Sequence, residues 1–460
     1  MFDNLITLTD SYKVSHYLQY PPGTTQVYSY WESRGGLFQE VEFFGLQYYL
    51  KRYFSKRITM EDILNAEKIF ALHFGDSKLF NKQGWLDILQ NHNGYLPIRI
   101  RSVPEGSVIP TRNIMLSIES TDPELPWVTN YAETLLSLMW YPSTVATISR
   151  EIKKVIKKYL EETGDPNTLD FKLQDFGFRG TEVVESAAIG GAAHLTNFKG
   201  TDNLVALEMA TLFYDKDMAG FSIPASEHST ITSWGKNYEF DAYRNMLNQF
   251  GQNSNFPAVA VVSDSYDIFN ACENGWGGEL FNDVLNMKNM LVVRPDSGIP
   301  HIIDVQVIET LDKKFGHAVN GKGYKILNNV RVIQGDGVSY DEINNILSAL
   351  KMRHWSADNI SFGMGGNLLQ NMTRDTQSFA IKASFVIVNG EERNIFKSPI
   401  TDNNKRSKKG KLKLIRNNDN ILETVSLHSP GIDIMRTVFE NGQILVDDNF
   451  DTIRERAIIL

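Results

Sequence analysis

The sequence predicts an α/β protein with an irregular βα-barrel domain over residues 169–384 and an α+β domain built from residues 1–168 and 385–460. Two observations support the barrel. Between about residue 170 and residue 390, short Val- and Ile-rich strands alternate with helices, which is typical of parallel strands joined by crossover helices. In addition, seven of the apolar runs end abruptly in Gly, Asp, Ser or Arg, as the loops on the C-terminal face of a βα-barrel do.

Size and composition set the protein class. The chain has 460 residues, 42% hydrophobic and 22% charged, as in a globular protein large enough for two or three domains. Its net charge of −9 gives no overall attraction to nucleic acid or to a membrane surface. A single cysteine, Cys272, excludes an intramolecular disulfide and fits a reducing compartment. No signal peptide and no apolar stretch of roughly 20 residues is found, so we expect a cytoplasmic protein.

The N-terminal region mixes helix and strand patterns. Helical spacing of apolar residues or alternation of apolar and polar residues predicts, in order, a helix at 61–74, strands at 96–103 and 108–118, and helices at 127–140 and 147–159. Near the C-terminus, Asn441-Gly442 between two apolar pairs predicts a hairpin. We expect this tail to return to the N-terminal domain.

The central region supplies the barrel elements. The predicted strands include 258–262, 290–293, 330–333 and 360–362, and the predicted helices include 206–213, 231–250, 302–315 and 340–350. An open doubly wound sheet would show the same alternation, but its site residues would come mainly from one switch point rather than from every loop.

The polar loops carry the candidate chemistry. In chain order they are Asp175-Phe176-Gly177-Phe178-Arg179-Gly180, Lys199-Gly200-Thr201-Asp202, Ser222-Ile223-Pro224-Ala225-Ser226-Glu227-His228, Ser263-Asp264-Ser265-Tyr266-Asp267, Arg294-Pro295-Asp296-Ser297-Gly298, Gln334-Gly335-Asp336-Gly337 and Gly363-Met364-Gly365-Gly366. This combination of Arg, Asp and Gly suits a phosphorylated, magnesium-bound substrate.

Three residues in these loops are the strongest catalytic candidates. His228, beside an acidic residue at a predicted helix start, could be a base, a phosphate contact or a nucleophile, or an incidental residue of a capped helix. Arg294 can clamp phosphate. Asp296 can accept hydrogen bonds from ribose hydroxyls or bind Mg²⁺. The structural alternative is a salt bridge between Arg294 and Asp296 at the end of the strand.

Other loop residues are individually less specific. The glycines of 335–337 and 363–366 expose backbone N–H groups that can surround an anion. Asp202, Asp264 and Asp267 are carboxylates that could equally cap helices. The basic run 405–411 is either a solvated loop or a segment that reaches over a polyphosphate, which could be bound to a partner subunit. The run is too short to indicate nucleic acid binding.

Several enzyme classes lack their motifs. The sequence has no Cys/His metal cluster, no H-E-x-x-H, no G-x-S-x-G elbow, no Walker loop and no G-x-G-x-x-G leading a βαβ unit. This argues against a zinc hydrolase, an α/β-hydrolase and a nicotinamide-dependent dehydrogenase.

The loop set, together with flanking segments, resembles the nicotinamide phosphoribosyltransferases, a family of type II phosphoribosyltransferases, nearly end to end. The resemblance is carried by the loops that begin at Asp175, Lys199, Ser263, Arg294 and Gln334, by Glu227-His228 of the third loop, and by Asp10-Ser11-Tyr12-Lys13, Asn197-Phe198, Ser229-Thr230-Ile231-Thr232 and Asn404-Lys405-Arg406-Ser407-Lys408-Lys409-Gly410. It implies transfer of phosphoribose from phosphoribosyl pyrophosphate to nicotinamide. The products would be nicotinamide mononucleotide and pyrophosphate.

The resemblance also implies cofactors and an assembly. Mg²⁺ would be required, bound mainly through substrate phosphates, with Asp267 or Asp296 as candidate protein ligands. ATP would phosphorylate His228 and so couple its hydrolysis to turnover. The enzyme would be a homodimer with two active sites at the subunit interface.

Residue roles follow from the same resemblance. Phe176 would stack on one face of nicotinamide, Tyr12 of the partner subunit on the other, and Asp202 would accept a hydrogen bond from the carboxamide. Arg179 and Arg294 would hold the base pocket and the pyrophosphate. The remaining substrate contacts implied are Ser222, Ser263, Asp267, Asp296, Gly335, Asp336, Gly365, Gly366, Arg374, Lys382, Lys397 and Lys405.

The chain departs from the family pattern at Met364, Asn367, Phe178 and Ser226. Nicotinate phosphoribosyltransferase is the closest alternative function, and Asp202 argues against it because a carboxylate repels the carboxylate of nicotinate. A magnesium-dependent aldolase or isomerase would want a strand-end Lys or enolising base that the barrel strands lack. A binding or scaffold protein without catalytic activity would have no need for the combination of Arg294, Asp296, Asp336 and His228.

Overall fold

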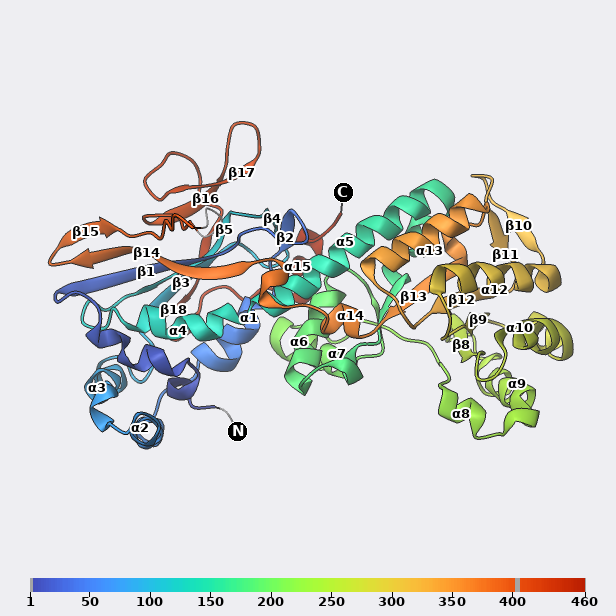
Figure 1. Cartoon of the computed structure of the whole chain (residues 1–460), viewed down its shortest axis with the longest axis horizontal. Coiled ribbons are helices and arrows are strands. Elements are labelled where there is room, and N and C mark those ends of the chain that lie inside the picture. The colour runs from blue at the N-terminus through green and yellow to red at the C-terminus, as the bar shows by residue number, and fades with distance from the viewer. Residues whose placement is uncertain (1–2, 402–405, 460) are drawn as a thin grey trace. The chain divides into compact units, whose positions relative to one another are not determined.

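The computed structural model describes residues 3–401 and 406–459, which fall into two compact units (Figure 1). Unit 1 comprises Met1–Thr147, Leu212–Lys216 and Met372–Ile458, and unit 2 comprises Ile148–Thr211, Asp217–Asn371 and Ile459–Leu460. Their edges differ from the ranges expected above, 1–168 with 385–460 and 169–384. Residues 372–384 group with unit 1 because strand β14 (Phe379–Val388) pairs along its whole length with β1 (Thr24–Ser33).

Unit 1 is built on a seven-stranded antiparallel sheet. The strand order is β15-β14-β1-β5-β3-β18-β19, with β15 at Glu391–Asn394, β5 at Ile114–Ser120, β3 at Ile98–Ser102, β18 at Arg436–Glu440 and β19 at Gln443–Ile444. The hairpin at Asn441-Gly442 is confirmed, since Phe439 pairs with Ile444 and both turn residues have positive φ. Because β18 pairs with β3, the C-terminal tail does return to the N-terminal region.

Helices and short ladders complete unit 1. The helices are α1 (Leu46–Tyr49), α2 (Met60–Phe74), α3 (Lys82–Asn91), α4 (Val128–Ser137), the first part of α5 (Trp140–Thr163) and α15 (Phe450–Arg456). The short ladders pair β2 (Glu40–Glu42) with β4 (Val108–Pro110) and β16 (Leu412–Arg416) with β17 (Leu422–Ser426).

Two sequence predictions in unit 1 meet different outcomes. The helix expected at 61–74 is confirmed, and a capping box between Thr59 and Asp62 fixes its start. The single strand expected at 108–118 is wrong. Arg112 takes a left-handed conformation, with φ of 66°, and turns the chain between β4 and β5.

Unit 2 is built on a curled, six-stranded parallel sheet. Its order is β7-β6-β13-β12-β9-β8, with β7 at Gly200–Thr201, β6 at Leu173–Asp175, β13 at Ile360–Met364, β12 at Val330–Gln334, β9 at Met290–Arg294 and β8 at Ala258–Val262. Parallel bridges from Phe221 to Gly200 and from Ala225 to Ala260 connect both edge strands to the segment 221–225. The sheet therefore curls until the first strand, β6, pairs with the last, β13.

This strand order decides between the two architectures left open by the sequence. Going round the sheet, neighbours follow chain order, whereas a doubly wound sheet reverses order at a switch point. The βα-barrel class is therefore confirmed. The strands are buried on both faces, which explains their continuous apolar runs, such as Val259, Ala260, Val261 and Val262, each at most 5% exposed.

Helices follow the strands of unit 2. They are α6 (Val184–Leu195), α7 (Leu204–Tyr214), α8 (His228–Thr232), α9 (Glu239–Phe250), α10 (Ile268–Asn270), α11 (Phe281–Leu285), α12 (Pro300–Phe315), α13 (Tyr340–Met352) and α14 (Gly366–Leu369), with a hairpin of β10 (His317–Val319) and β11 (Lys325–Leu327) after α12. The single helix expected at 231–250 is wrong. Gly235, with φ of 88°, interrupts the helix and separates α8 from α9.

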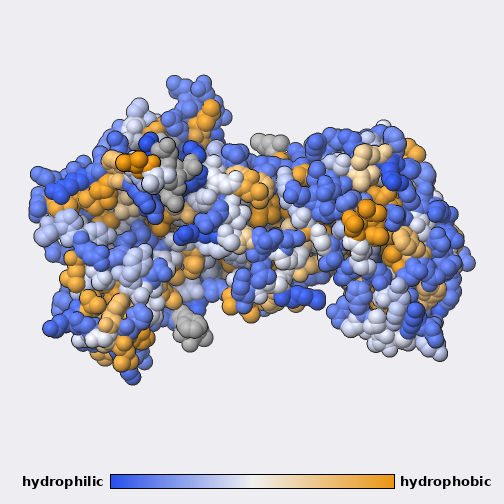
Figure 2. All heavy atoms as spheres, in the orientation of Figure 1, coloured by the Kyte–Doolittle hydropathy of each residue, from blue (hydrophilic) through white to orange (hydrophobic). Residues whose placement is uncertain are grey.

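The exposed surface in Figure 2 is largely hydrophilic, with apolar side chains in small groups. Within residues 3–401 and 406–459, no helix combines the length and the apolar character needed to cross a bilayer.

Candidate active site

A cavity of about 880 Å³ opens at the C-terminal ends of the strands of unit 2. Residues from six of the seven polar loops line it: Asp175, Phe176, Phe178, Arg179, Gly180, Asp202, Glu227, His228, Ser229, Arg294, Asp296, Gly335, Asp336, Gly365 and Gly366. A neighbouring cavity of about 580 Å³ shares the two glycine loops and is lined by Gly335–Val338, Gly365–Asn367, Gln370 and Asn371. The sequence-predicted loops therefore come together at one end of the barrel.

The ring of Phe176 is set by the backbone around it. Its N–H donates a hydrogen bond to the carbonyl of Met364, 3.1 Å away. The ring lies directly on Gly363, where a Cβ atom would sit 1.9 Å from a ring carbon. Glycine is therefore required at 363 for the ring to lie where it does. The half-buried ring presents an apolar face at the cavity, as a planar ligand would need.

Asp175 connects the first two loops beneath this ring. Its buried carboxylate accepts hydrogen bonds from Gly177 N at 2.7 Å and Asn203 Nδ2 at 2.9 Å, and its carbonyl accepts one from Asp202 N. Burial raises the pKa of this carboxyl to about 6, and these hydrogen bonds oppose the rise. The arrangement fixes Asp202 at the cavity, where its exposed carboxylate accepts a hydrogen bond from Ser222 Oγ.

His228 begins α8 and is held by a buried carboxylate. Its Nε2 lies 3.0 Å from Oδ1 of Asp264, whose side chain is only 5% exposed. Asp264 also accepts hydrogen bonds from Asp296 N at 3.1 Å and Ser297 Oγ at 2.6 Å. Because Asp264 offers only acceptor oxygens when ionised, it favours a proton on Nε2 and leaves a lone pair on Nδ1.

Arg294 and Asp296 form a two-pronged pair beside His228. Nε and Nη2 of Arg294 donate to the two carboxylate oxygens of Asp296 at 3.1 and 2.8 Å. Nδ1 of His228 lies 3.9 Å from Asp296 Oδ2. The salt bridge foreseen from the sequence is present, and both of its residues line the cavity.

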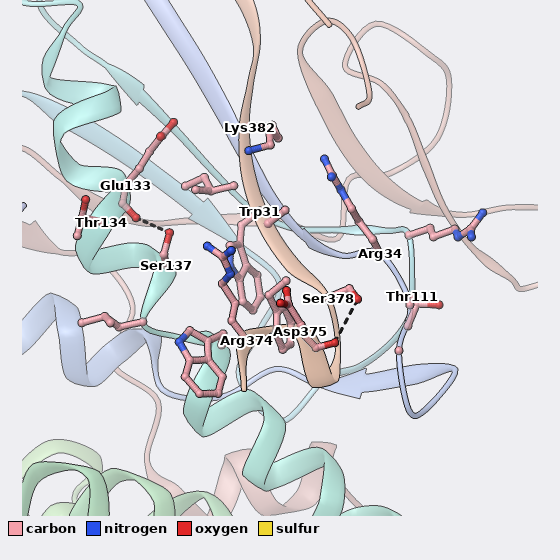
Figure 3. Close-up of a pocket in the computed structure, with 18 of the residues that line it drawn as sticks. Trp31, Arg34, Thr111, Glu133, Thr134, Ser137, Arg374, Asp375, Ser378 and Lys382 are labelled. Carbon is pink, nitrogen blue, oxygen red and sulfur yellow. Dashed lines mark hydrogen bonds between the residues drawn. The ribbon is translucent and has the colours of Figure 1, made fainter. Parts of the chain in front are cut away.

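A second cavity, of about 1060 Å³, lies in unit 1, and we call it the basic pocket. Six of its lining residues are basic and three are acidic. Tyr12, Arg374, Lys382 and Lys397, all predicted from the sequence, line it. In Figure 3, Lys382, Arg34 and Arg374 lie around the indole of Trp31. Burial, together with neighbouring Arg34 and Lys397, lowers the pKa of Lys382.

Comparison with known proteins identifies the family of this chain. The profile of the nicotinate phosphoribosyltransferase family matches residues 171–443, and that of the nicotinamide phosphoribosyltransferase N-terminal domain matches residues 4–100. The chain belongs to the nicotinate phosphoribosyltransferase family. It is therefore a phosphoribosyltransferase enzyme, and the family resemblance seen in the loops is confirmed.

Similar proteins from bacteria cover nearly the whole enzyme. A nicotinamide phosphoribosyltransferase of Xanthomonas campestris pv. campestris is 49% identical over 99% of this chain and 98% of the relative. The protein of the same name from Acinetobacter baylyi is 32% identical over 98% of this chain and 97% of the relative.

Solved structures match the fold at low sequence identity. Nicotinate-nucleotide pyrophosphorylase from Pyrococcus furiosus is 15% identical and covers 99% of this chain and 95% of its own, with a TM-score of 0.64. Human nicotinic acid phosphoribosyltransferase is 14% identical over 98% of this chain and 92% of its own, with a TM-score of 0.56.

Two predicted site residues of this phosphoribosyltransferase, Ser263 and Asp267, lie away from the cavity. Ser263 is fully buried, where its Oγ accepts a hydrogen bond from the indole of Trp276 and donates one to Val261 O. Asp267 caps α10 through the N–H groups of Phe269 and Asn270 and does not line the cavity. Lys405 falls outside the residues that the structure describes.

Sequence reasoning missed basic residues of unit 1. Arg34, Arg112 and the buried Lys13 line the basic pocket, with Lys13 paired to Glu133 at 3.0 Å. Nη2 of Arg34 is buried and has no hydrogen-bond partner among the described residues, while Nε of the same side chain lies 3.4 Å from Glu32 Oε1. The available signal was Arg34-Gly35-Gly36 directly after a strand, the pattern used to find the barrel loops.

Proposed function

We propose that the enzyme transfers phosphoribose from phosphoribosyl pyrophosphate to the ring nitrogen of nicotinamide, giving nicotinamide mononucleotide and pyrophosphate in NAD salvage. Similar proteins named nicotinamide phosphoribosyltransferase, at up to 49% identity over essentially the full chain, support this substrate. The observation that carries the choice of base is the carboxylate of Asp202 at the cavity that Phe176 lines. The single cysteine of the chain, the buried Cys272, suits a cytoplasmic location.

Base recognition divides between these two residues. The Phe176 ring would stack on the pyridine ring. Asp202, which has its second oxygen available beside the Ser222 bond, would accept a hydrogen bond from the carboxamide N–H₂. Nicotinate would instead bring a carboxylate against Asp202, and such like-charge contact in a partly closed site is costly.

The reaction needs stabilisation of charge in the transition state more than it needs a general base to remove a proton. The C1–O bond to pyrophosphate breaks and its electron pair leaves with pyrophosphate, while the lone pair of the pyridine nitrogen forms the new C1–N bond. Negative charge therefore grows on the leaving group and positive charge on the ribose. Arg294, held in orientation by Asp296, and Arg179 would stabilise the leaving group, and Asp296 and Asp336 would bind ribose hydroxyls.

The smaller cavity is proposed to hold the 5′-phosphate. Gly335, Gly365 and Gly366 form part of its wall, and glycine backbone N–H groups can approach an anion closely. Its lining shares residues with the larger cavity, so one substrate can occupy both.

ATP coupling is proposed to run through His228. With Nε2 hydrogen-bonded to Asp264, the Nδ1 lone pair would attack the γ-phosphorus of ATP, and the bond to ADP would break as ADP leaves. Arg294 lies on the same wall and can neutralise charge on the transferred phosphoryl group.

Magnesium is proposed to arrive with the substrate. Among the described residues, no group of three or more His, Cys, Asp or Glu side chains is arranged to hold a metal ion. Asp296 is engaged by Arg294, and Asp267 by the start of α10. The residues present therefore fit a cation held mainly by pyrophosphate oxygens, which is how Mg²⁺ commonly binds in phosphate sites.

A homodimer with shared sites would explain the basic pocket. In this proposal, Arg374, Lys382 and Lys397 of the partner subunit approach the pyrophosphate, and Tyr12 of the partner subunit stacks on the open face of nicotinamide. Tyr12 is 61% exposed in the single chain, as such a role requires. Lys405, which the sequence placed with these phosphate contacts, stays a prediction.

The test is a product assay on purified enzyme. With nicotinamide, phosphoribosyl pyrophosphate and Mg²⁺, mass spectrometry should detect nicotinamide mononucleotide, with a higher rate when ATP is added. Formation of nicotinate mononucleotide from nicotinate, with no product from nicotinamide, would refute the proposal.

A further inference from the structure

Asn367 links the two glycine loops that form the smaller cavity. It stands at the second residue of α14, and its side-chain Nδ2 donates a hydrogen bond of 2.7 Å to the carbonyl of Val338. Asn371 in turn donates from its Nδ2 to Asn367 Oδ1 at 3.0 Å, which fixes the orientation of the amide. We call this pair of contacts the Asn367 bridge. Both loops line the cavity, and so does Asn367 itself.

These loops have a clear need for such a link. The first loop contains Gly335 and Gly337, and Gly337 has φ of 65°; the second contains Gly365 and Gly366. Glycine segments lose much conformational entropy when they are ordered, so their N–H groups point at one ligand only if other contacts hold them. Within the first loop, Gln334 Nε2 bonds Asp336 O at 2.7 Å, but that contact does not reach the second loop.

We propose that Asn367 is a positioning residue for the phosphate at the 5′ end of the substrate. The Asn367 bridge sets the separation of the two glycine loops, so that the backbone N–H groups of both loops face one anion. This inference rests on the proposed function only in naming the anion as a ribose 5-phosphate group. The bridge itself contacts a main-chain carbonyl and leaves Val338, which is 3% exposed, anchored in the core.

The chain offers a matched comparison at Asn320. Its Nδ2 donates to the carbonyl of Thr163 at 2.8 Å, a link of the same chemistry within unit 2, and Asn320 lines neither cavity of this unit. Replacing Asn320 by Ala removes a similar amide bridge, together with turn contacts to Lys322 N and Tyr324 N. It therefore reports what the loss of such a bridge does to folding alone.

The experiment compares the wild type with Asn367→Ala, Asn371→Ala and Asn320→Ala. Steady-state kinetics would give KM for both substrates, and calorimetry would give the dissociation constant for ribose 5-phosphate. Loss of one hydrogen bond that orders a site should weaken phosphate binding by about three- to ten-fold. We expect Asn367→Ala to raise KM for phosphoribosyl pyrophosphate and the ribose 5-phosphate dissociation constant by that factor, with KM for nicotinamide within two-fold. Asn371→Ala should act in the same direction more weakly.

The outcomes separate this inference from the proposed reaction. Unchanged ribose 5-phosphate affinity in Asn367→Ala, or an equal loss in Asn320→Ala, would overturn the role of the bridge. A uniform rise of both KM values would do the same, because it would indicate general loosening. If Asn367→Ala cannot be purified folded, unchanged affinity in Asn371→Ala decides against the inference. If the wild type makes no nicotinamide mononucleotide while affinity still falls in Asn367→Ala, only the proposed reaction fails.

Discussion

Nε2 of His228 lies 3.0 Å from Oδ1 of Asp264, and the other oxygen of the same carboxylate binds Ser297 Oγ at 2.6 Å. The imidazole at the mouth of the barrel is therefore held by a group that is itself fixed on two sides. Such support gives the ring one orientation and one preferred tautomer, as a nucleophilic histidine needs.

Replacing His228 by Ala should abolish the stimulation of turnover by ATP. The cavity keeps Arg294 and Asp202, so product formation without ATP should continue at a reduced rate. Initial rates with and without ATP measure the effect. His317→Ala is the control, because His317 pairs with Asp312 at 2.6 Å in unit 2 but does not line the cavity. ATP stimulation that persists in His228→Ala would rule out the phosphohistidine.

Gly363→Ala should weaken nicotinamide binding. A Cβ at this position would lie 1.9 Å from the ring of Phe176, so the variant must displace the ring from its present position. We expect KM for nicotinamide to rise by about ten-fold and the melting temperature to fall, since overpacking costs about 1–3 kcal/mol. Gly321→Ala is the matched control, because its added Cβ meets nothing within 4 Å. An unchanged KM in Gly363→Ala would show that Phe176 does not contact the base.

Mixing two inactive variants should restore activity if the sites are shared between subunits. Arg374→Ala alters the basic pocket, and Asp296→Ala alters the barrel cavity. In a mixed two-fold dimer, one of the two sites would take both intact halves, so random mixing should recover roughly a quarter of wild-type activity. The mixture must be refolded or co-expressed to exchange subunits. Recovery no greater than the sum of the separate variants would argue that each subunit works alone.

Glu105 should make the stability of the enzyme depend on pH. The side chain is buried and accepts hydrogen bonds from Gln47 N at 2.6 Å and Gly45 N at 3.1 Å, where α1 begins. Burial raises its pKa from 4.5 to about 7. The folded state therefore holds this proton more tightly than the unfolded chain does, and stability falls as the pH rises from about 4.5 to about 7.

Glu105→Gln should remove this dependence. Relative to the wild type, the variant should gain up to about 3 kcal/mol between pH 4.5 and pH 8, following the shift from 4.5 to about 7. Thermal unfolding of both proteins across that range measures the change. Glu423→Gln, at an exposed position of β17, should show no such trend. A constant difference between wild type and Glu105→Gln at all pH values would contradict the assignment.

The barrel and its loops could be foreseen because their signals are local. Each strand, turn and helix start lies within a few consecutive residues, so Phe176, His228 and Arg294 could be assigned to one face of the barrel before any contact was known. The break at Gly235 was missed because apolar spacing continues across it, while only the backbone conformation shows the interruption.

The basic pocket could not be assembled in the same way. Arg34 and Lys382 meet because β1 and β14 pair across more than 300 residues of chain, with Tyr30 opposite Lys382. No local pattern encodes that pairing. Ser263 stands in a polar loop and was predicted as a substrate contact. The structure instead places it inside the core, where its Oγ accepts a hydrogen bond from the indole of Trp276.

Asp202→Asn should relax the choice of base. A neutral amide removes the repulsion of nicotinate and can donate a hydrogen bond to its carboxylate. The ratio of kcat/KM for nicotinamide to that for nicotinate should therefore fall by about ten-fold or more. Ser222→Ala keeps the charge and removes one hydrogen bond to Asp202, so its ratio should change much less.

The same ratio in the wild-type enzyme tests the central claim most directly. Purified enzyme would be given nicotinamide and nicotinate in equal amounts, with phosphoribosyl pyrophosphate, ATP and Mg²⁺, and both mononucleotides would be quantified by mass spectrometry. The arrangement of Phe176 and Asp202 predicts nicotinamide mononucleotide as the dominant product. Predominant nicotinate mononucleotide would contradict the account.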